Sequence, residues 1–323
     1  MDQPNLSPLH DLHLNNSAKF IEFAGWTMPF SYSGTINEHN FVRDDVGYFD
    51  VSHMGRLKID NKSIDFLSSL ICSDIKNLNY GKALYSIFTD DNGCALDDVI
   101  FWKFSTYILL ICNAINTDKI TSHLTVNNIN YEDITKETAL VAVQGPNSLD
   151  KLEGILSIPE SFSCLEDDIY TYARTGYTGE DGLEIMVATE NLDKLIGLLT
   201  NNNIQPCGLG SRDTLRLEAS LPLYGFELSE DITPVEAGLK WTLTNPKTYL
   251  GIEKINHQIK TSRHKVLKKF IIESRNIART GTQVKSNETR GVVTSGNYSP
   301  ILKKSIGFVL LESMPDTDLL EFE

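Results

Sequence analysis

The sequence contains no close pair of cysteines and no cluster of histidines. Its five cysteines form an odd set without a C-x-x-C pair, and its seven histidines include no H-E-x-x-H motif. Disulfide frameworks and zinc sites depend on such spacings. We therefore expect buried free thiols, a reducing compartment and no metal site.

Long apolar runs and an excess of positive charge are also missing. No stretch approaches the roughly 20 uninterrupted apolar residues that a membrane span requires, and the start has neither a signal-peptide core nor the character of a transit peptide. Lysine and arginine number 29 against 43 aspartates and glutamates, a formal net charge of −14, whereas nucleic-acid-binding surfaces are basic. We expect a cytoplasmic protein without nucleic-acid or membrane partners. A mitochondrial location would require a presequence that has been removed.

The chain has 323 residues, enough for two or three domains, and shows no repeat with a period of 20 to 50 residues. Short apolar or alternating runs bounded by Gly, Asn, Asp or Pro predict strands at 55–60, 83–88, 98–104, 107–112, 139–145, 168–175, 183–188, 269–274 and 305–311. Helical spacing predicts helices within 63–72, 191–202 and 211–225. Strands and helices do not alternate strictly, so the sequence predicts an α+β fold with mostly antiparallel sheets.

Two adjacent aspartates, Asp97 and Asp98, interrupt the apolar stretch "GCALDDVIFW". In a strand their side chains face opposite ways, and both faces carry apolar neighbours. At least one carboxylate is then expected to face a cleft or a buried polar partner, because an unpaired buried charge is costly. In the alternative interpretation, both lie at the start of the strand and accept turn amides after "DNG".

The stretch "RTGYTGEDGLEI" spaces its glycines as G-x-x-G-x-x-G, which is neither a dinucleotide nor a Walker motif. One interpretation is a hairpin with a loose turn. In the other, Tyr177 stacks on a flat ring and Glu184 accepts paired hydrogen bonds from an amino-pyrimidine edge.

Two further residues have a structural and a functional interpretation. Arg212, in "CGLGSRDTLRLEASLPLYG", either forms an ion pair with Asp213 at the start of a helix or contacts an anionic ligand tail. His53, in "FDVSHMGRL", is either a base or a hydrogen-bonded structural residue.

Nine motifs occur in an order that resembles the aminomethyltransferase of the glycine cleavage system, the T-protein. They are "FAGWTMPFSY", "DVSHMG", "GKALYS", "LDDVI", "VAVQGP", "RTGYTGEDGLEI", "CGLGSRDTLRLEASLPLYG", "TPVEAGLKW" and "TSGNYSP". Each is weak alone, but together they are specific, and the resemblance covers roughly residues 8 to 312.

The resemblance implies a three-domain cloverleaf around a central folate cleft. The domains would comprise residues 1–50 with 137–255, residues 51–136, and a small barrel at 256–323. A polar segment from about residue 256 to residue 268 favours the last boundary.

The reaction implied is the transfer of methylene from the aminomethyl-lipoyl arm of the H-protein to tetrahydrofolate, with release of ammonia. In the family pattern, Asp98 approaches the reacting folate nitrogens, and Glu184 and Arg212 bind folate. Four further residues match positions that line the folate cleft: Tyr85, Met54, Asn113 and Tyr177. We expect Asp98 to orient the folate and stabilise positive charge, and Asp97 to be structural.

The chain departs from the family pattern at two places. Cys94 replaces the second of two glycines before the aspartates, for which we expect only a local adjustment. The chain also ends at Glu323, in an acidic tail with Glu312, Asp316, Asp318 and Glu321, where relatives continue through further strands. We therefore expect a shortened third domain with an exposed sheet edge.

The alternatives are a folate-dependent demethylase-type relative of the same fold and a folate-binding module without catalysis. An iron–sulfur assembly factor with this fold would carry a "KGCYxGQE"-like motif, but "KTYLGIEKI" stands there. The densest basic run, "KTSRHKVLKK" at residues 260–269, is either a docking surface for an acidic carrier protein or a solvated linker.

Overall fold

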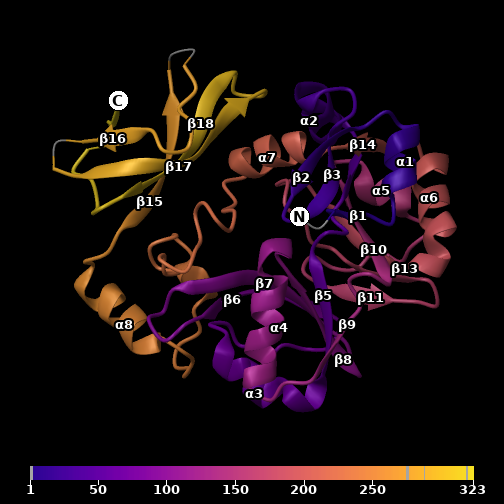
Figure 1. The fold of residues 1–323 in the computed structure, drawn as a ribbon, viewed down its shortest axis with the longest axis horizontal. Helices are drawn as coiled ribbons and strands as arrows, with labels where there is room; N and C mark the ends of the chain where they lie inside the picture. The colour runs from indigo at the N-terminus through magenta and orange to yellow at the C-terminus, as the bar shows by residue number, and fades with distance from the viewer. Residues whose placement is uncertain (1–2, 274–275, 287, 318) are drawn as a thin grey trace. The chain divides into compact units, whose positions relative to one another are not determined.

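The computed structural model describes residues 3–273, 276–286, 288–317 and 319–323, and its elements are labelled in Figure 1. The chain forms two compact units, which we describe separately. The first unit comprises Met1–Ser63, Asn77–Leu84 and Ile100–Arg216, and the second comprises Ile64–Lys76, Tyr85–Val99 and Leu217–Glu323.

A six-stranded sheet forms the centre of the first unit. Its order is β11 (Cys164–Glu166), β12 (Tyr170–Ala173), β13 (Gly182–Ala188), β10 (Thr138–Gln144), β4 (Gly47–Asp50) and β14 (Gln205–Cys207). All neighbours are antiparallel except β14 and β4. Every residue of β10 is buried, as expected for a strand that is covered on both faces.

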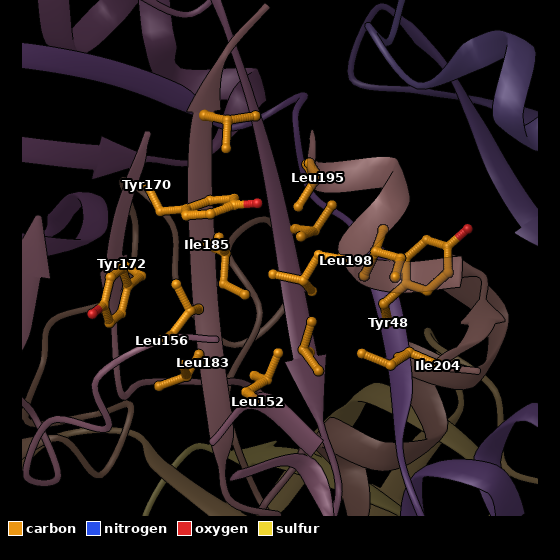
Figure 2. Close-up of a cluster of buried hydrophobic side chains, with 14 of the residues drawn as sticks. Tyr48, Leu152, Leu156, Tyr170, Tyr172, Leu183, Ile185, Leu195, Leu198 and Ile204 are labelled. Carbon is orange, nitrogen blue, oxygen red and sulfur yellow. The ribbon is translucent and has the colours of Figure 1, made fainter. Parts of the chain in front are cut away.

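The two faces of this sheet pack against different elements. Val141 and Val143 belong to a buried cluster on one face. Figure 2 shows this cluster, with Leu195 and Leu198 of α6 (Leu192–Asn201) labelled. Leu140, on the other face, packs in a cluster with residues of α2, α7 and a second sheet. Successive side chains of β10 therefore point into two different clusters, and both faces of this strand are buried.

The second sheet has five strands in the order β6 (Lys82–Thr89), β7 (Ala95–Lys103), β8 (Tyr107–Cys112), β5 (Gly55–Asp60) and β9 (Tyr131–Asp133). Strands β6 and β7 each begin in one unit and end in the other. A smaller sheet of the first unit has the order β1 (Asn5–Leu6), β3 (Trp26–Ser31) and β2 (Lys19–Phe23).

The second unit contains a five-stranded antiparallel sheet near the C-terminal end of the chain (Figure 1). Its order is β15 (Val266–Ile272), β18 (Lys304–Leu311), β17 (Arg290–Ser299), β16 (Gln283–Lys285) and β19 (Glu321–Phe322). Val309 and Leu311 face one cluster, while Ile306 and Phe308 face another. Alternate side chains of β18 therefore pack on opposite faces of the sheet.

Helices and short 3₁₀ turns connect the strands. The α-helices not yet given are α1 (His10–Asn15), α2 (Thr35–Asp44), α3 (Ile64–Leu70), α4 (Thr117–Val126), α5 (Ser148–Leu152), α7 (Leu209–Glu218) and α8 (Ile252–Thr261). The 3₁₀ turns are η1 (Asn61–Ser63), η2 (Ala114–Asn116), η3 (Thr189–Asn191) and η4 (Lys240–Thr242). Within the described residues, no helix is long and apolar enough to cross a membrane.

The α+β class, the mostly antiparallel sheets and the predicted strands and helices are confirmed. The predicted strand at 269–274 forms the end of β15, although Ser274 lies outside the described residues, as does Asp318 of the acidic tail. The three-domain division stays a prediction.

Candidate active site

The two aspartates lie within β7 and differ in burial. Asp97 is fully buried, whereas Asp98 is half-buried on the other face of the strand. Asp90 accepts hydrogen bonds from two backbone amides of the turn before β7. Its Oδ1 lies 2.9 Å from Asn92 N and 2.8 Å from Cys94 N. Asp90 therefore satisfies two amides of this turn, and β7 presents one enclosed and one half-buried carboxylate.

Asp98 accepts a hydrogen bond from the adjacent strand. Tyr85 Oη, on β6, lies 3.0 Å from Asp98 Oδ2. Both side chains are half-buried and belong to the second unit. The hydroxyl fixes the orientation of the carboxylate, which is what a group that stabilises developing positive charge requires.

The other predicted site residues belong to the first unit. Glu184 lies on β13, is 7% exposed, and accepts a hydrogen bond from Thr175 Oγ1 at 2.6 Å. Its cross-strand neighbours are Ala142 on β10 and Ala173 on β12. Because side chains opposite one another share a face of the sheet, two small alanines flank the carboxylate.

The glycine spacing between β12 and β13 has a packing reason. A Cβ at Gly176 would lie 1.8 Å from Gln144 Oε1, and one at Gly182 would lie 2.0 Å from Val143 O. Gln144 Oε1 also accepts a hydrogen bond from Thr178 Oγ1 at 3.1 Å. The glycines therefore let this hairpin loop approach the end of β10 closely.

Arg212 lies over the ring of Tyr177. Its Cζ is 4.9 Å from the Tyr177 ring centroid and 5.8 Å from that of Phe49. Burial lowers the pKa of Arg212, and nearby Glu184 and Tyr177 oppose that change. Nη1 is enclosed and has no hydrogen-bond partner among the residues that the structure describes. An enclosed guanidinium N–H of this kind fits an anionic ligand group.

The ion pair at the start of α7 has a different partner from the one that the sequence suggested. Asp213 Oδ1 accepts a hydrogen bond from Arg216 Nε at 3.0 Å, one helical turn further along. Arg212 instead contacts the Tyr177 and Phe49 rings and lies near Glu184.

Met54 and Asn113 lie at the same end of two paired strands. Gly55 of β5 pairs with Cys112 of β8, and the two predicted residues stand one position beyond this pair. Both are half-buried. The structure thus brings these two predicted residues close to each other.

His53 is buried, and its ring packs edge-on against Phe23 at a centroid distance of 5.4 Å. Burial lowers the pKa of His53 to about 4; Arg212 and Arg56 act in the same direction, and Asp50 opposes them. The imidazole is therefore neutral near pH 7. Its Nδ1 has no hydrogen-bond partner in the described part of the chain.

A buried network around Asp50 was not found from the sequence. Asp50 Oδ2 accepts a hydrogen bond from Ser7 Oγ and lies 2.8 Å from His13 Nε2, and the other ring nitrogen of His13 lies 2.9 Å from Tyr32 Oη. Burial alone raises the pKa of Asp50, but His13, Ser52 and Ser7 outweigh it and lower the pKa to about 2. The network joins the N-terminal segment to β4 across sequence separations that no local pattern reveals.

Among the residues described, no group of three or more His, Cys, Asp or Glu side chains is arranged to hold a metal ion. The five cysteines are free, and all are buried except Cys94, which is half-buried.

Comparison with known proteins gives consistent similarities over almost the whole chain. Residues 9–247 match a family model described as the GCVT N-terminal domain. An aminomethyltransferase of Prochlorococcus marinus is 38% identical, with 94% of this chain and 90% of the relative covered. One from Thermosipho melanesiensis is also 38% identical, with coverage of 95% and 89%. The crystal structure of glycine cleavage system aminomethyltransferase T from Bartonella henselae has a TM-score of 0.90 at 29% identity, and the match covers 95% of this chain and 90% of that one.

Proposed function

The chain belongs to the family of glycine cleavage system aminomethyltransferases, the T-proteins, and from this membership we propose which reaction it catalyses. The protein transfers methylene from the aminomethyl-lipoyl arm of a lipoylated H-protein to tetrahydrofolate and releases ammonia. The observation that carries this proposal is the similarity to curated aminomethyltransferases over 94% of the chain.

Asp98 is the residue proposed to act on the reacting atoms. Ammonia leaves with an added proton as the carbon–nitrogen bond of the aminomethyl thioether breaks, and the remaining carbon is electron-poor. One folate nitrogen attacks this carbon while positive charge grows on the folate. A second folate nitrogen then displaces the lipoyl sulfur, so that the carbon–sulfur bond breaks, a proton returns to the thiol and the methylene bridges the two nitrogens. A carboxylate with a fixed orientation stabilises that charge, and the bond from Tyr85 supplies the orientation. Holding the two reactants in register contributes in addition.

The residues of the first unit are proposed to bind the folate. Glu184 would accept hydrogen bonds from the amino-pyrimidine edge, because its carboxylate is flanked by small residues. Arg212, with its enclosed Nη1, would contact an anionic group, and Tyr177 would contribute its ring. Met54 and Asn113 are proposed to line the same site.

We further propose a cytoplasmic location. The five free cysteines are compatible with a reducing compartment.

The experiment that tests the function is ammonia release from an aminomethyl-loaded, lipoylated carrier protein, with and without tetrahydrofolate. Wild type should release ammonia in a folate-dependent manner, and Asp98→Asn should be slower by about 100-fold or more, the usual effect of removing an electrostatic stabiliser. Tyr85 can still donate to the side-chain amide oxygen that this substitution introduces, so the fold around β7 should be retained.

Asp97→Asn is the matched control, because it makes the same chemical change one position earlier. It should lower the free energy of unfolding, since Asp97 is fully buried, while the folded fraction keeps its activity. Tight folate binding by a wild type that releases no ammonia would instead indicate a folate-binding module. Equal release by wild type and Asp98→Asn would show that the aspartate was wrongly chosen.

A further inference from the structure

An exposed tryptophan contacts the tyrosine that orients Asp98. Trp241, in η4, is 68% exposed, whereas Trp26 and Trp102, the other tryptophans of the chain, are buried. The Trp241 and Tyr85 rings stack with centroids 5.5 Å apart and an interplanar angle of 23°. These three contacting residues, Asp98 included, belong to the second unit.

The segment that carries Trp241 is tied to residues 71–73, which precede β6 in the chain. Lys247 Nζ donates to the carbonyl oxygens of Ile71 at 2.5 Å and Ser73 at 2.6 Å. Ser73 Oγ lies 2.8 Å from the carbonyl oxygen of Thr242, the residue after Trp241. These hydrogen bonds therefore hold the backbone that carries the indole ring.

Residues 71–73 are also bonded to β6. Cys72 N donates to Ile87 O at 3.1 Å, and Ser73 N lies 3.3 Å from Ser86 Oγ. Ser73 Oγ lies 3.3 Å from the carbonyl oxygen of Tyr85 itself. Residues 71–73 are thus hydrogen-bonded both to β6, which carries Tyr85, and to the residue that follows Trp241. The backbones on both sides of the stacked rings are therefore anchored.

We propose that Trp241 is a positioning residue for the transfer reaction: its indole ring holds Tyr85 in the side-chain conformation whose hydroxyl bonds Asp98. This inference rests on the function proposed above. Tyr85 is half-buried, and an offset aromatic stack favours one orientation of its ring over those that turn toward solvent. Without the stack, Asp98 loses a fixed donor and with it a defined carboxylate orientation.

The kinetic test compares Trp241→Ala with the conservative Trp241→Phe. The alanine variant should lower kcat for ammonia release by about tenfold, a factor that corresponds to about 1.4 kcal/mol, while the KM for tetrahydrofolate changes less than about twofold. The phenylalanine variant should restore kcat to within about threefold of wild type, because its ring can still stack. A rise in KM with unchanged kcat would overturn the proposal.

A double-mutant cycle with Tyr85→Phe tests the route of the effect. If Trp241 acts through the Tyr85 hydroxyl, Trp241→Ala should have almost no further effect on kcat in a Tyr85→Phe background. An equal fall in both backgrounds would show that Trp241 acts independently of Tyr85. Phe66→Ala is the control for losing an exposed aromatic side chain in the second unit, since Phe66 is 58% exposed, and it should leave kcat unchanged.

Fluorescence separates this inference from the proposed function. The emission of Trp241 is the difference between wild type and Trp241→Phe, since the other two tryptophans are present in both proteins and cancel in the subtraction. In a Tyr85→Ala background that difference spectrum should move to longer wavelength, because one face of the indole becomes hydrated. An unmoved spectrum would overturn the stack even in an active enzyme. If the spectrum shifts in the Tyr85→Ala background but the wild type has no transferase activity, the stack is supported and the proposed function is refuted.

Discussion

His53 illustrates how a single buried side chain in the first unit has its charge state set by its surroundings. The ring packs on Phe23 and lies near two cations, Arg56 and Arg212, which add to the effect of burial. Asp50 acts the other way, but its carboxylate is already paired with His13. His53 is therefore a neutral aromatic side chain near pH 7.

The low pKa of His53 predicts a pH dependence of stability. Its folded-state pKa of about 4 lies below the ordinary value of 6.5, so the unfolded chain takes up the proton first as the pH falls. The stability contribution is complete above about pH 6.5 and is lost progressively down to about pH 4. The loss amounts to about 3 kcal/mol at 1.36 kcal/mol per pKa unit.

Urea unfolding at pH 7, 5.5 and 4.5 measures this loss. Both proteins should carry Trp241→Phe, so that the emission comes from Trp26 and Trp102, which lie in the first unit. His53→Gln should lose markedly less stability across this pH range than its parent. Parallel pH profiles would show that His53 is not buried in its neutral form.

At the scale of elements, the turn before β7 and the start of α8 depend on each other. Gly93 and Gly251 both have left-handed backbones, with φ of +76° and +73°. A Cβ at Gly251 would lie 2.2 Å from Gly93 N. The backbone N–H of Cys94, the next residue, donates to Asp90 Oδ1 at 2.8 Å. The close approach between the two turns therefore involves Gly93 and Gly251.

Gly251→Ala should destabilise the second unit more than Gly281→Ala does. Both glycines have positive φ, but nothing lies within 4 Å of a Cβ at Gly281. The control should cost about 1–2 kcal/mol for the left-handed conformation, and Gly251→Ala about 1–3 kcal/mol more for overpacking. Urea unfolding followed by Trp241 emission measures both. Equal losses would contradict a tight contact between the two turns.

At the scale of the whole molecule, a strongly acidic chain carries one basic segment. The formal net charge is −14, yet residues 260–269 contain five lysines and arginines and no acidic residue. The segment spans the end of α8 and the start of β15, an edge strand of its sheet. Lysines on an edge strand also discourage pairing with other chains, so charge alone does not assign this segment to a carrier.

We predict that Arg263→Glu combined with Lys269→Glu raises the KM for the lipoylated carrier by about tenfold at low salt. Both residues are exposed, and charge pairs at an interface mainly affect association. The KM for tetrahydrofolate and kcat should stay unchanged, and the effect should shrink as salt screens the charges.

Lys136→Glu combined with Lys194→Glu is the matched control for this prediction, because it changes the net charge of the molecule equally at exposed positions. If both pairs weaken carrier binding alike, overall charge accounts for the effect and the basic segment is a solvated linker.

The sequence was sufficient for features that depend on local periodicity. Strands such as β5 and β8 coincide with the apolar runs that predicted them, and the period of two placed Asp97 and Asp98 on opposite faces of one strand. The ordered motifs identified the family, because motif order survives where identity has fallen to 38%.

Contacts between residues distant in the chain could be found only in the folded structure. The pairing of β6 with β7 brings Tyr85 to Asp98, and packing places Arg212 over the Tyr177 ring. The motif "TPVEAGLKW" contains Trp241, but nothing in its spacing shows that the ring is exposed and stacked. Such contacts depend on how strands and helices pack, whereas local periodicity states only which way each side chain faces.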